Sequence, residues 1–220
     1  LLPLIELGLN ERVFKDVNTL TAHGYDGSWI YLVRGTVNAT RGNYQASIDD
    51  LEKFAAKNPK ASSIHALLAK IYMGAGNYKD TVKAATRAIE SNPSDDDSRR
   101  LRGTANFCLR NYQAALDDLN FLLNKNENDR TLLELAGFSY LGLNQNTLGE
   151  KCFDKIIANF PEHHSGFLYK GLYLADTGDK NQAYELLSSA IKIAPTRASL
   201  YTERAKIALE LDEQDKAVAD

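Results

Sequence analysis

The chain has 220 residues, of which 44% are hydrophobic and 25% are charged, and its formal net charge is −3. This composition is typical of an ordinary globular protein and excludes both a disordered chain and a membrane protein. The small acidic excess argues against a general nucleic-acid binder, which usually carries a basic excess. No apolar run approaches the roughly 20 residues that cross a bilayer.

Residues 1–27 are interpreted as the end of a partial repeat. A turn at residues 8–10 is followed by Val13, Val17 and Leu20 at helical spacing, and residues 23–27 are rich in turn formers. The opening LLPLIELGL lacks a basic segment and contains a proline, so it is not an intact signal peptide. The chain does not begin with Met, so an alternative is that a signal peptide has been removed.

From residue 28 onward, one pattern recurs every 34 residues. A small residue marks the period at Gly35, Ala69, Gly103, Gly137, Gly171 and Ala205. Full repeats are predicted at 28–61, 62–95, 96–129, 130–163 and 164–197, and a truncated repeat at 198–220. A fixed period of this length is typical of stacked-repeat architectures, in which each unit needs its neighbours to fold. Because both ends stop inside a unit, we expect a segment of a longer chain that is organised as one solenoid over residues 1–220.

Each repeat is predicted to be two amphipathic helices joined by a tight turn. In the second full repeat, Ile64, Leu68 and Ile71 recur three or four residues apart, which places them on one face of a helix. Gly76 follows as the residue that ends this helix, and Pro93 closes the second helix. The small residue in the middle of the first helix is expected to let the second helix approach closely.

These residues resemble the tetratricopeptide repeat, whose pattern is a large residue, Leu-Gly, Tyr, Ala, an aromatic residue or Leu, Ala and Pro. The match includes Tyr31, Gly35, Tyr44, Leu51, Pro59, Leu68, Ala69, Tyr72, Ala85, Ala88, Pro93, Gly103, Tyr112, Gly137, Tyr140, Phe153, Pro161, Gly171, Ala183, Ala190 and Pro195. Asn144 departs from the pattern at a turn glycine, and Glu127 departs at a closing proline. The resemblance implies an all-α fold, a right-handed superhelical solenoid of antiparallel helix pairs.

The resemblance also implies a binding site, because members of this family typically bind peptides or partner proteins in a concave groove lined by the first helix of each repeat. Carried over by position, the groove residues are Leu32, Thr36, Lys70, Arg100, Thr104, Phe107, Phe138, Leu141, Leu168 and Leu172. A second interpretation stays open, in which Phe107, Phe138, Leu141 and Leu172 pack between neighbouring helices.

The groove positions also suggest which ligand the site would take. Some family members hold a C-terminal carboxylate with Lys and Asn at set groove positions. Here those positions hold Leu32 with Thr36, Ala66 with Lys70, and Arg100 with Thr104, so this clamp is absent. A mostly apolar extended or helical ligand is therefore favoured.

No catalytic, metal or cofactor site is predicted, and the segment is interpreted as non-enzymatic. The adjacent His163 and His164 have no further ligands close in sequence, so a solvated loop is favoured over a metal site. His65 is interpreted as a core histidine. Cys108 and Cys152 lie inside helical patterns of different repeats and are predicted to be buried, reduced thiols.

The predicted function is that of a protein-interaction scaffold or adaptor. The alternative is a substrate-recruiting arm of a larger enzyme or of a secretion or assembly complex. A weaker hypothesis is self-association through the faces of the terminal repeats. We expect no nucleic-acid partner and no membrane insertion. The sequence does not decide the compartment: the cytoplasm is slightly favoured, and a periplasmic or secreted location stays open.

Overall fold

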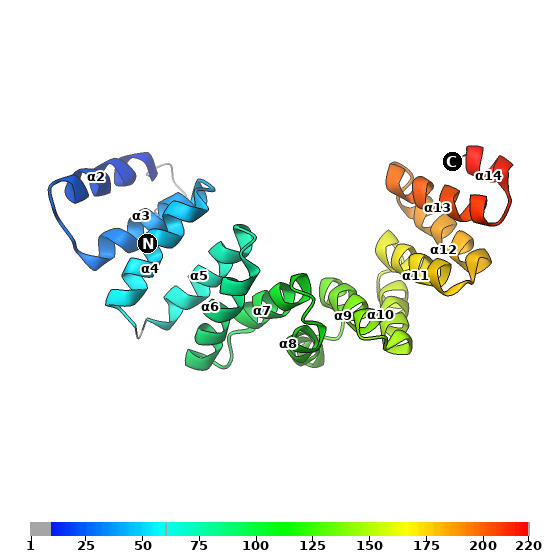
Figure 1. Cartoon of the computed structure of the whole chain (residues 1–220), viewed down its shortest axis with the longest axis horizontal. Coiled ribbons are helices and arrows are strands. Elements are labelled where there is room, and N and C mark those ends of the chain that lie inside the picture. The colour runs from blue at the N-terminus through cyan, green and yellow to red at the C-terminus, as the bar shows by residue number, and fades with distance from the viewer. Residues whose placement is uncertain (1–9, 60, 220) are drawn as a thin grey trace. The chain divides into compact units, whose positions relative to one another are not determined.

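The described part of the chain is built of helices alone (Figure 1). The computed structural model describes residues 10–59 and 61–219, which form thirteen helices and no strand. The predicted turn at residues 8–10 lies largely outside these residues. The expected all-α fold of consecutive packed helix pairs is confirmed.

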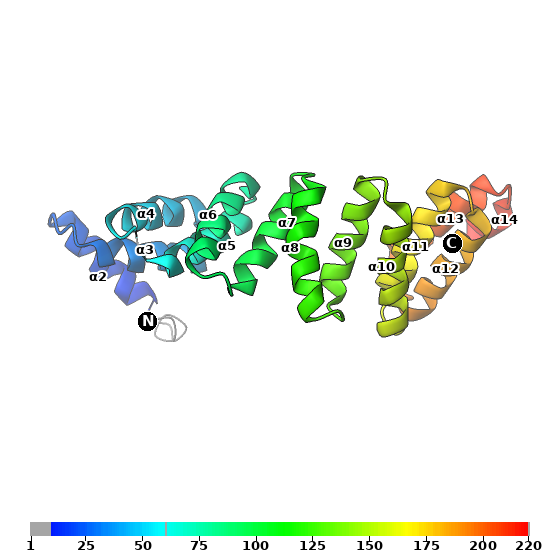
Figure 2. The same ribbon diagram turned by 90° about the horizontal axis from the view of Figure 1, so that it is seen from below.

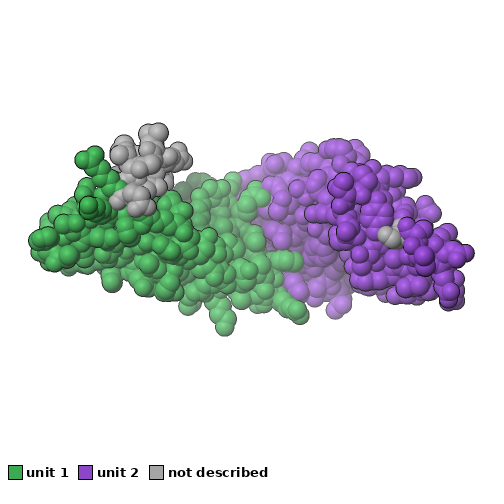
Figure 3. Space-filling view, turned by 90° about the horizontal axis from the view of Figure 1, so that it is seen from above, with its two compact units in different colours: residues 1–111 green, residues 112–220 purple. Residues whose placement is uncertain are grey.

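The helices divide between two compact units, residues 1–111 and residues 112–220, shown in green and purple in Figure 3. The first unit contains α2 (Asn10–Ala22), α3 (Ser28–Thr40), α4 (Tyr44–Lys57), α5 (Ser62–Gly74), α6 (Tyr78–Ser91) and α7 (Asp96–Cys108). The second unit contains α8 (Tyr112–Lys125), α9 (Arg130–Gly142), α10 (Asn146–Asn159), α11 (His164–Thr177), α12 (Lys180–Ile193), α13 (Ala198–Glu210) and α14 (Gln214–Ala219).

The 34-residue period of the sequence is visible in the helix bounds. First helices start at residues 28, 62, 96, 130, 164 and 198, and second helices start at 44, 78, 112, 146, 180 and 214. Successive helices of a pair, such as α5 and α6, lie side by side in Figure 1 and in the rotated view of Figure 2. The division of the chain into repeats stays a prediction, although the helix starts follow its register.

The turns between the two helices of a pair share one feature of the backbone. One residue of each turn has a positive φ, and these residues are Gly42, Gly76, Arg110, Asn144, Gly178 and Asp212. In five of these turns the next residue donates its N–H to a carbonyl five positions earlier, as Asn77 does to Tyr72 at 2.8 Å. This is the hydrogen bond that ends a helix in the Schellman motif. The turn geometry therefore repeats in these five turns, even where glycine does not, whereas the turn at Gly178 has a φ of 104° and lacks this bond.

Small residues in the first helices let the second helices approach. A Cβ added at Gly35 would lie 2.7 Å from the Leu51 side chain, and one added at Gly137 would lie 2.6 Å from the Phe153 ring. Leu51 and Phe153 are both fully buried. The close approach at these two positions agrees with the role that the sequence predicts for the small residue.

Candidate functional site

The residues predicted to line the groove all lie on first helices. In the first unit, Leu32 and Thr36 are on α3, Lys70 is on α5, and Arg100, Thr104 and Phe107 are on α7. In the second unit, Phe138 and Leu141 are on α9, and Leu168 and Leu172 are on α11. Each unit therefore carries its own set of candidate positions.

In the first unit, the polar candidates divide into exposed charges and hydroxyls that their own helices use. Lys70 is exposed, and its Nζ lies 3.4 Å from the Asp97 carboxylate. The Thr36 hydroxyl donates to the Leu32 carbonyl at 2.7 Å, and the Thr104 hydroxyl donates to the Arg100 carbonyl at 2.8 Å. Such bonds within a helix occupy the hydroxyl proton. Thr36 is also buried, so its side chain offers little to a ligand.

In the second unit, the apolar candidates pack against the core and keep part of their surface exposed. The half-buried Phe138 ring makes edge contacts with Phe153 and Tyr169, at centroid distances of 5.4 and 4.8 Å. Leu141 lies over the position where Gly149 lacks a side chain. Leu168 packs against two separate clusters of buried residues. These side chains therefore contribute to packing whether or not they also contact a ligand.

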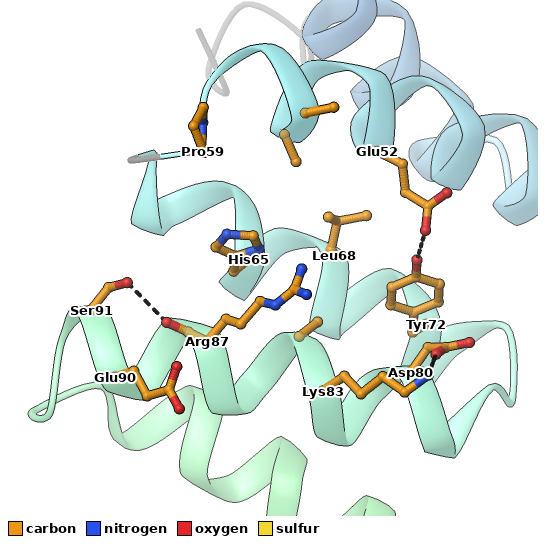
Figure 4. A pocket seen from close by; sticks show the side chains of 13 residues that line it. Glu52, Pro59, His65, Leu68, Tyr72, Asp80, Lys83, Arg87, Glu90 and Ser91 are labelled. Atoms are coloured by element: carbon orange, nitrogen blue, oxygen red, sulfur yellow. Dashed lines mark hydrogen bonds and ion pairs between the residues drawn. The ribbon is translucent and has the colours of Figure 1, made fainter.

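A cleft that the sequence analysis did not predict lies in the first unit, between α4, α5 and α6 (Figure 4). We call it the first cleft; its volume is about 700 Å³. It is lined by Glu52, Ala55, Ala56, Pro59, His65, Leu68, Tyr72, Asp80, Lys83, Ala84, Arg87, Glu90 and Ser91. His65 is half-buried at this cleft, so its predicted place in the core is wrong.

Two carboxylates of the first cleft, Glu52 and Asp80, accept hydrogen bonds from neighbouring side chains. The Tyr72 hydroxyl donates to the Glu52 carboxylate at 2.5 Å; burial and this bond raise the pKa of Tyr72. Lys83 lies 2.7 Å from Asp80, and hydrogen bonds from Lys83 and Asn77 lower the pKa of Asp80. Burial and the nearby Arg87 guanidinium lower the pKa of His65.

A second cleft of about 560 Å³ lies in the second unit, between α8, α9 and α10. It is lined by Asn120, Leu123, Asn124, Lys125, Glu127, Leu133, Tyr140, Leu148, Lys151, Cys152 and Lys155. Most of these positions are equivalent to positions of the first cleft, because residue 120 follows residue 52, and residue 140 follows residue 72, by two periods. The interaction between tyrosine and the α-helix before it is also repeated: Asn120 Nδ2 donates to the Tyr140 hydroxyl at 3.0 Å.

The two cysteines differ in burial. Both thiols are free; Cys152 is buried, and burial raises its pKa to about 11 despite the nearby Lys155. Cys108 is exposed at the end of α7, so its predicted burial is wrong.

The His163 ring accepts a hydrogen bond from the Ser165 N–H at the start of α11, stacks on His164, and is half-buried. Within residues 10–59 and 61–219, no group of three or more His, Cys, Asp or Glu side chains could hold a metal ion.

Burial also sets the electrostatics of the paired histidines. It is the main cause that lowers the pKa of both His163 and His164, and nearby Arg130 and Arg197 add to it. The His164 ring is hydrogen-bonded to the Arg197 guanidinium. These contacts are not those of the solvated loop that the sequence favours.

A helix that spans a membrane must be long and apolar, and none in residues 10–59 and 61–219 meets both conditions.

Comparison with known proteins extends these observations. The sequence model of the tetratricopeptide repeat matches residues 32–80, 66–123 and 135–198, which together cover well over half of the chain. No curated protein matches this chain significantly.

Several solved structures share the fold. A tetratricopeptide repeat protein from Parabacteroides merdae ATCC 43184 has a TM-score of 0.75 at 20% identity, over 87% of this chain and 76% of its own. MamA from Desulfovibrio magneticus RS-1 has a TM-score of 0.71 at 17% identity, over 79% of this chain and 98% of its own. YrrB, a repeat protein described as having an unusual peptide-binding site, has a TM-score of 0.68 at 18% identity, over 85% and 96% of the two chains. The predicted solenoid class is thereby confirmed.

Proposed function

The chain belongs to the tetratricopeptide repeat family, and from this premise we propose that it is a non-catalytic scaffold that holds a peptide or a partner protein against the first helices of its repeats. The family is one of protein-interaction scaffolds. The proposal assigns the binding surface to the groove residues on α3, α5 and α7 in the first unit and on α9 and α11 in the second.

The observation that carries this proposal is the incomplete burial of apolar side chains at groove positions. Leu32, Phe107, Phe138, Leu141 and Leu172 are all half-buried. A side chain needed for packing alone gains most free energy when it is fully buried, as Leu51 and Phe153 are. Apolar surface that stays exposed at matching positions of successive repeats is typical of a surface that binds a partner.

The chemistry of these positions favours a mostly apolar ligand with a few acidic groups. The two Thr hydroxyls bond to their own helices, while Lys70 and Arg100 are exposed. An extended or helical segment would place apolar side chains on the half-buried residues and orient itself by these charges. The description of YrrB as a peptide-binding repeat protein supports this class of ligand at the level of the fold.

Affinity capture from a cell extract, followed by titration of the captured protein, tests the proposal. The variant Phe138→Ala/Leu172→Ala should weaken binding by about tenfold or more, because truncation of a central apolar contact costs over 1 kcal/mol. The matched control is Phe121→Ala, which removes an exposed ring from the second helix α8. Unchanged affinity of the double variant, with its fold verified by circular dichroism, would show that the groove assignment is wrong.

A further inference from the structure

The two clefts have cations at the same two positions but differ in their acids. Lys83 and Arg87 of the first cleft correspond, two periods later, to Lys151 and Lys155 of the second. Both pairs lie one helical turn apart on the second helix of their repeat, α6 and α10 respectively. Side chains four residues apart project from the same face of a helix, so each pair presents two positive charges to its cleft.

Three carboxylates that accompany these cations in the first cleft are replaced by neutral residues in the second. Asn120 stands at the position of Glu52, Leu148 at that of Asp80, and Ala158 at that of Glu90. The ion pair of Lys83 with Asp80, visible in Figure 4, therefore has no counterpart at Lys151. The second cleft keeps the positive charge of the shared framework and loses the acids that neutralise it.

The acid that does line the second cleft compensates little of this charge. Glu127 lies 3.9 Å from Lys155, at the outer limit of an ion pair, and both side chains are largely exposed. Such pairs contribute little because water screens them. Lys125 also lines the cleft, with its ammonium group over the Phe121 ring. Three lysines and one glutamate thus line this cleft, in a chain whose net charge is −3.

Part of the lining of the second cleft is apolar. Leu123, Leu133 and Leu148 line it, together with the buried Cys152, whose thiol stays protonated because burial raises its pKa. Leu148 is 42% exposed, which is high for a leucine beside a cleft. A ligand that matches these walls has apolar side chains for the leucines and negative charge for the lysines.

We propose that the second cleft binds a short acidic segment of a partner protein. Carboxylates of the segment pair with Lys151 and Lys155, and a neighbouring apolar side chain packs against Leu123 and Leu148. Charge complementarity selects this ligand, because opposite charges across an interface guide association and suppress wrong partners. An acidic peptide fits better than a nucleic acid, because it carries apolar side chains for the leucines as well as negative charge for the lysines.

This site is separate from the groove of the proposed function and does not depend on it. On α9, the cleft is lined by Leu133 and Tyr140, whereas the groove positions are Phe138 and Leu141. At 3.6 residues per turn, the centres of these two pairs are roughly 120° apart around the helix. The lysines lie on α10, which contributes no groove residue. Substitutions can therefore disable either surface alone.

The test is a fluorescence-anisotropy titration of the whole chain with a fluorescein-labelled peptide, Glu-Leu-Asp-Glu-Leu-Glu. We expect saturable binding that Lys151→Glu/Lys155→Glu weakens about tenfold or more, because each substitution reverses a charge that faces the ligand. The matched control, Lys83→Glu/Arg87→Glu at the equivalent positions of the first cleft, should leave the affinity within about twofold. Leu172→Ala, which changes a groove residue on α11 and no helix of the cleft, should also leave it unchanged, and this separates the result from a failure of the groove.

A second variant keeps both lysines and restores the acids. Asn120→Glu/Leu148→Asp/Ala158→Glu gives the second cleft the carboxylates of the first, and it should abolish binding as the charge reversal does. Four results would overturn the proposal: no anisotropy change up to about 1 mM peptide, equal binding of the neutral peptide Gln-Leu-Asn-Gln-Leu-Gln, no effect of the lysine substitutions, or tighter binding of a thymidine oligonucleotide of equal charge.

Discussion

The first and second clefts share a framework and differ in what they offer to solvent. In both, three consecutive helices surround the cleft, a tyrosine of the middle helix bonds to the helix before it, and two cations lie on the helix after it. The first cleft surrounds its cations with Glu52, Asp80 and Glu90, whereas the second has neutral residues at those positions. The difference teaches that the packing positions of a repeat preserve the fold, while the residues that line a cleft can change without disturbing it.

The largest expected effect tests whether the packing beneath the two clefts is equivalent. Leu51 and Leu119 are two periods apart, and both are fully buried. Leu51→Ala and Leu119→Ala should each lower the free energy of unfolding by about 2–5 kcal/mol, because each leaves a cavity. Urea titration followed by circular dichroism measures both. The exposed Leu209→Ala should change stability by less than about 0.5 kcal/mol. If either Leu→Ala substitution lowers the free energy of unfolding by less than about 1 kcal/mol, the packing beneath the two clefts is not energetically equivalent.

A smaller difference should separate the tyrosines of the two clefts. The Tyr72 hydroxyl donates to a carboxylate at 2.5 Å, whereas the Tyr140 hydroxyl bonds to the neutral amide of Asn120 at 3.0 Å. Tyr72→Phe should cost about 1.5 kcal/mol, the low end for a bond to a charged group because Glu52 is exposed, and Tyr140→Phe about 0.5–1 kcal/mol. Thermal or urea unfolding of the two variants measures the difference. A larger loss for Tyr140→Phe would contradict this ranking.

The turns that lead into α6 and α10 provide a third matched pair. Gly76 and Asn144 are equivalent, with φ of 72° and 59°. Glycine adopts this left-handed conformation without the steric cost that other residues bear, and asparagine bears a reduced cost. Gly76→Asn should therefore destabilise the first unit by less than about 1 kcal/mol, and Asn144→Gly should stabilise the second by a similar amount. Urea unfolding measures both changes in stability. If Asn144→Gly destabilises the protein instead, the side chain of Asn144 makes a contact that compensates its backbone strain.

The smallest expected effect is on the pH dependence of stability, through His65 of the first cleft, whose equivalent in the second cleft is Leu133. Burial and Arg87 lower the pKa of His65 in the folded protein, so below about pH 6.5 the unfolded chain binds more protons than the folded one. The contribution of His65 is therefore fully present above that pH and is lost as pH falls through 6.5 towards the lowered pKa.

Comparison of wild type with His65→Leu isolates this contribution from those of His163 and His164, whose pKa values are also lowered. The fall in the urea midpoint between pH 8 and pH 5.5 should be smaller in the variant. The other charged side chains of this cleft are the same in both proteins, so they do not contribute to the difference; they are Glu52, Asp80, Lys83, Arg87 and Glu90. An unchanged pH dependence, or a proton NMR titration that places the pKa of His65 above 6.5, would contradict the assignment.

The fold could be predicted from the sequence because its causes are local and repeated. Gly35 and Gly137 mark where two helices touch, and Gly76 marks where one helix ends. The left-handed conformation of Arg110 in the predicted turn of the third full repeat was not predicted, since this residue type gives no sign of it. The backbone of Arg110 has the same left-handed conformation as the equivalent Gly42 and Gly76 and accepts the local steric cost.

The candidate sites were predicted less completely. The groove residues follow from their positions on the first helices, but their packing does not: Thr36 is buried, and Phe138 rests on Phe153 and Tyr169. The two clefts were missed, although a comparison of charges at positions 68 residues apart, such as Glu52 with Asn120, would have indicated that the second is short of acids.

The sequence by itself determined the helix pairs, their period and the positions of close approach, because helix formation and helix ends depend on residues within a few positions of one another. Only the tertiary structure decided where space remains between helices and which charges share it. A cleft is the volume that side chains from three helices leave unfilled, and Tyr140, Lys151 and Asn120 meet at one only after α8, α9 and α10 have packed.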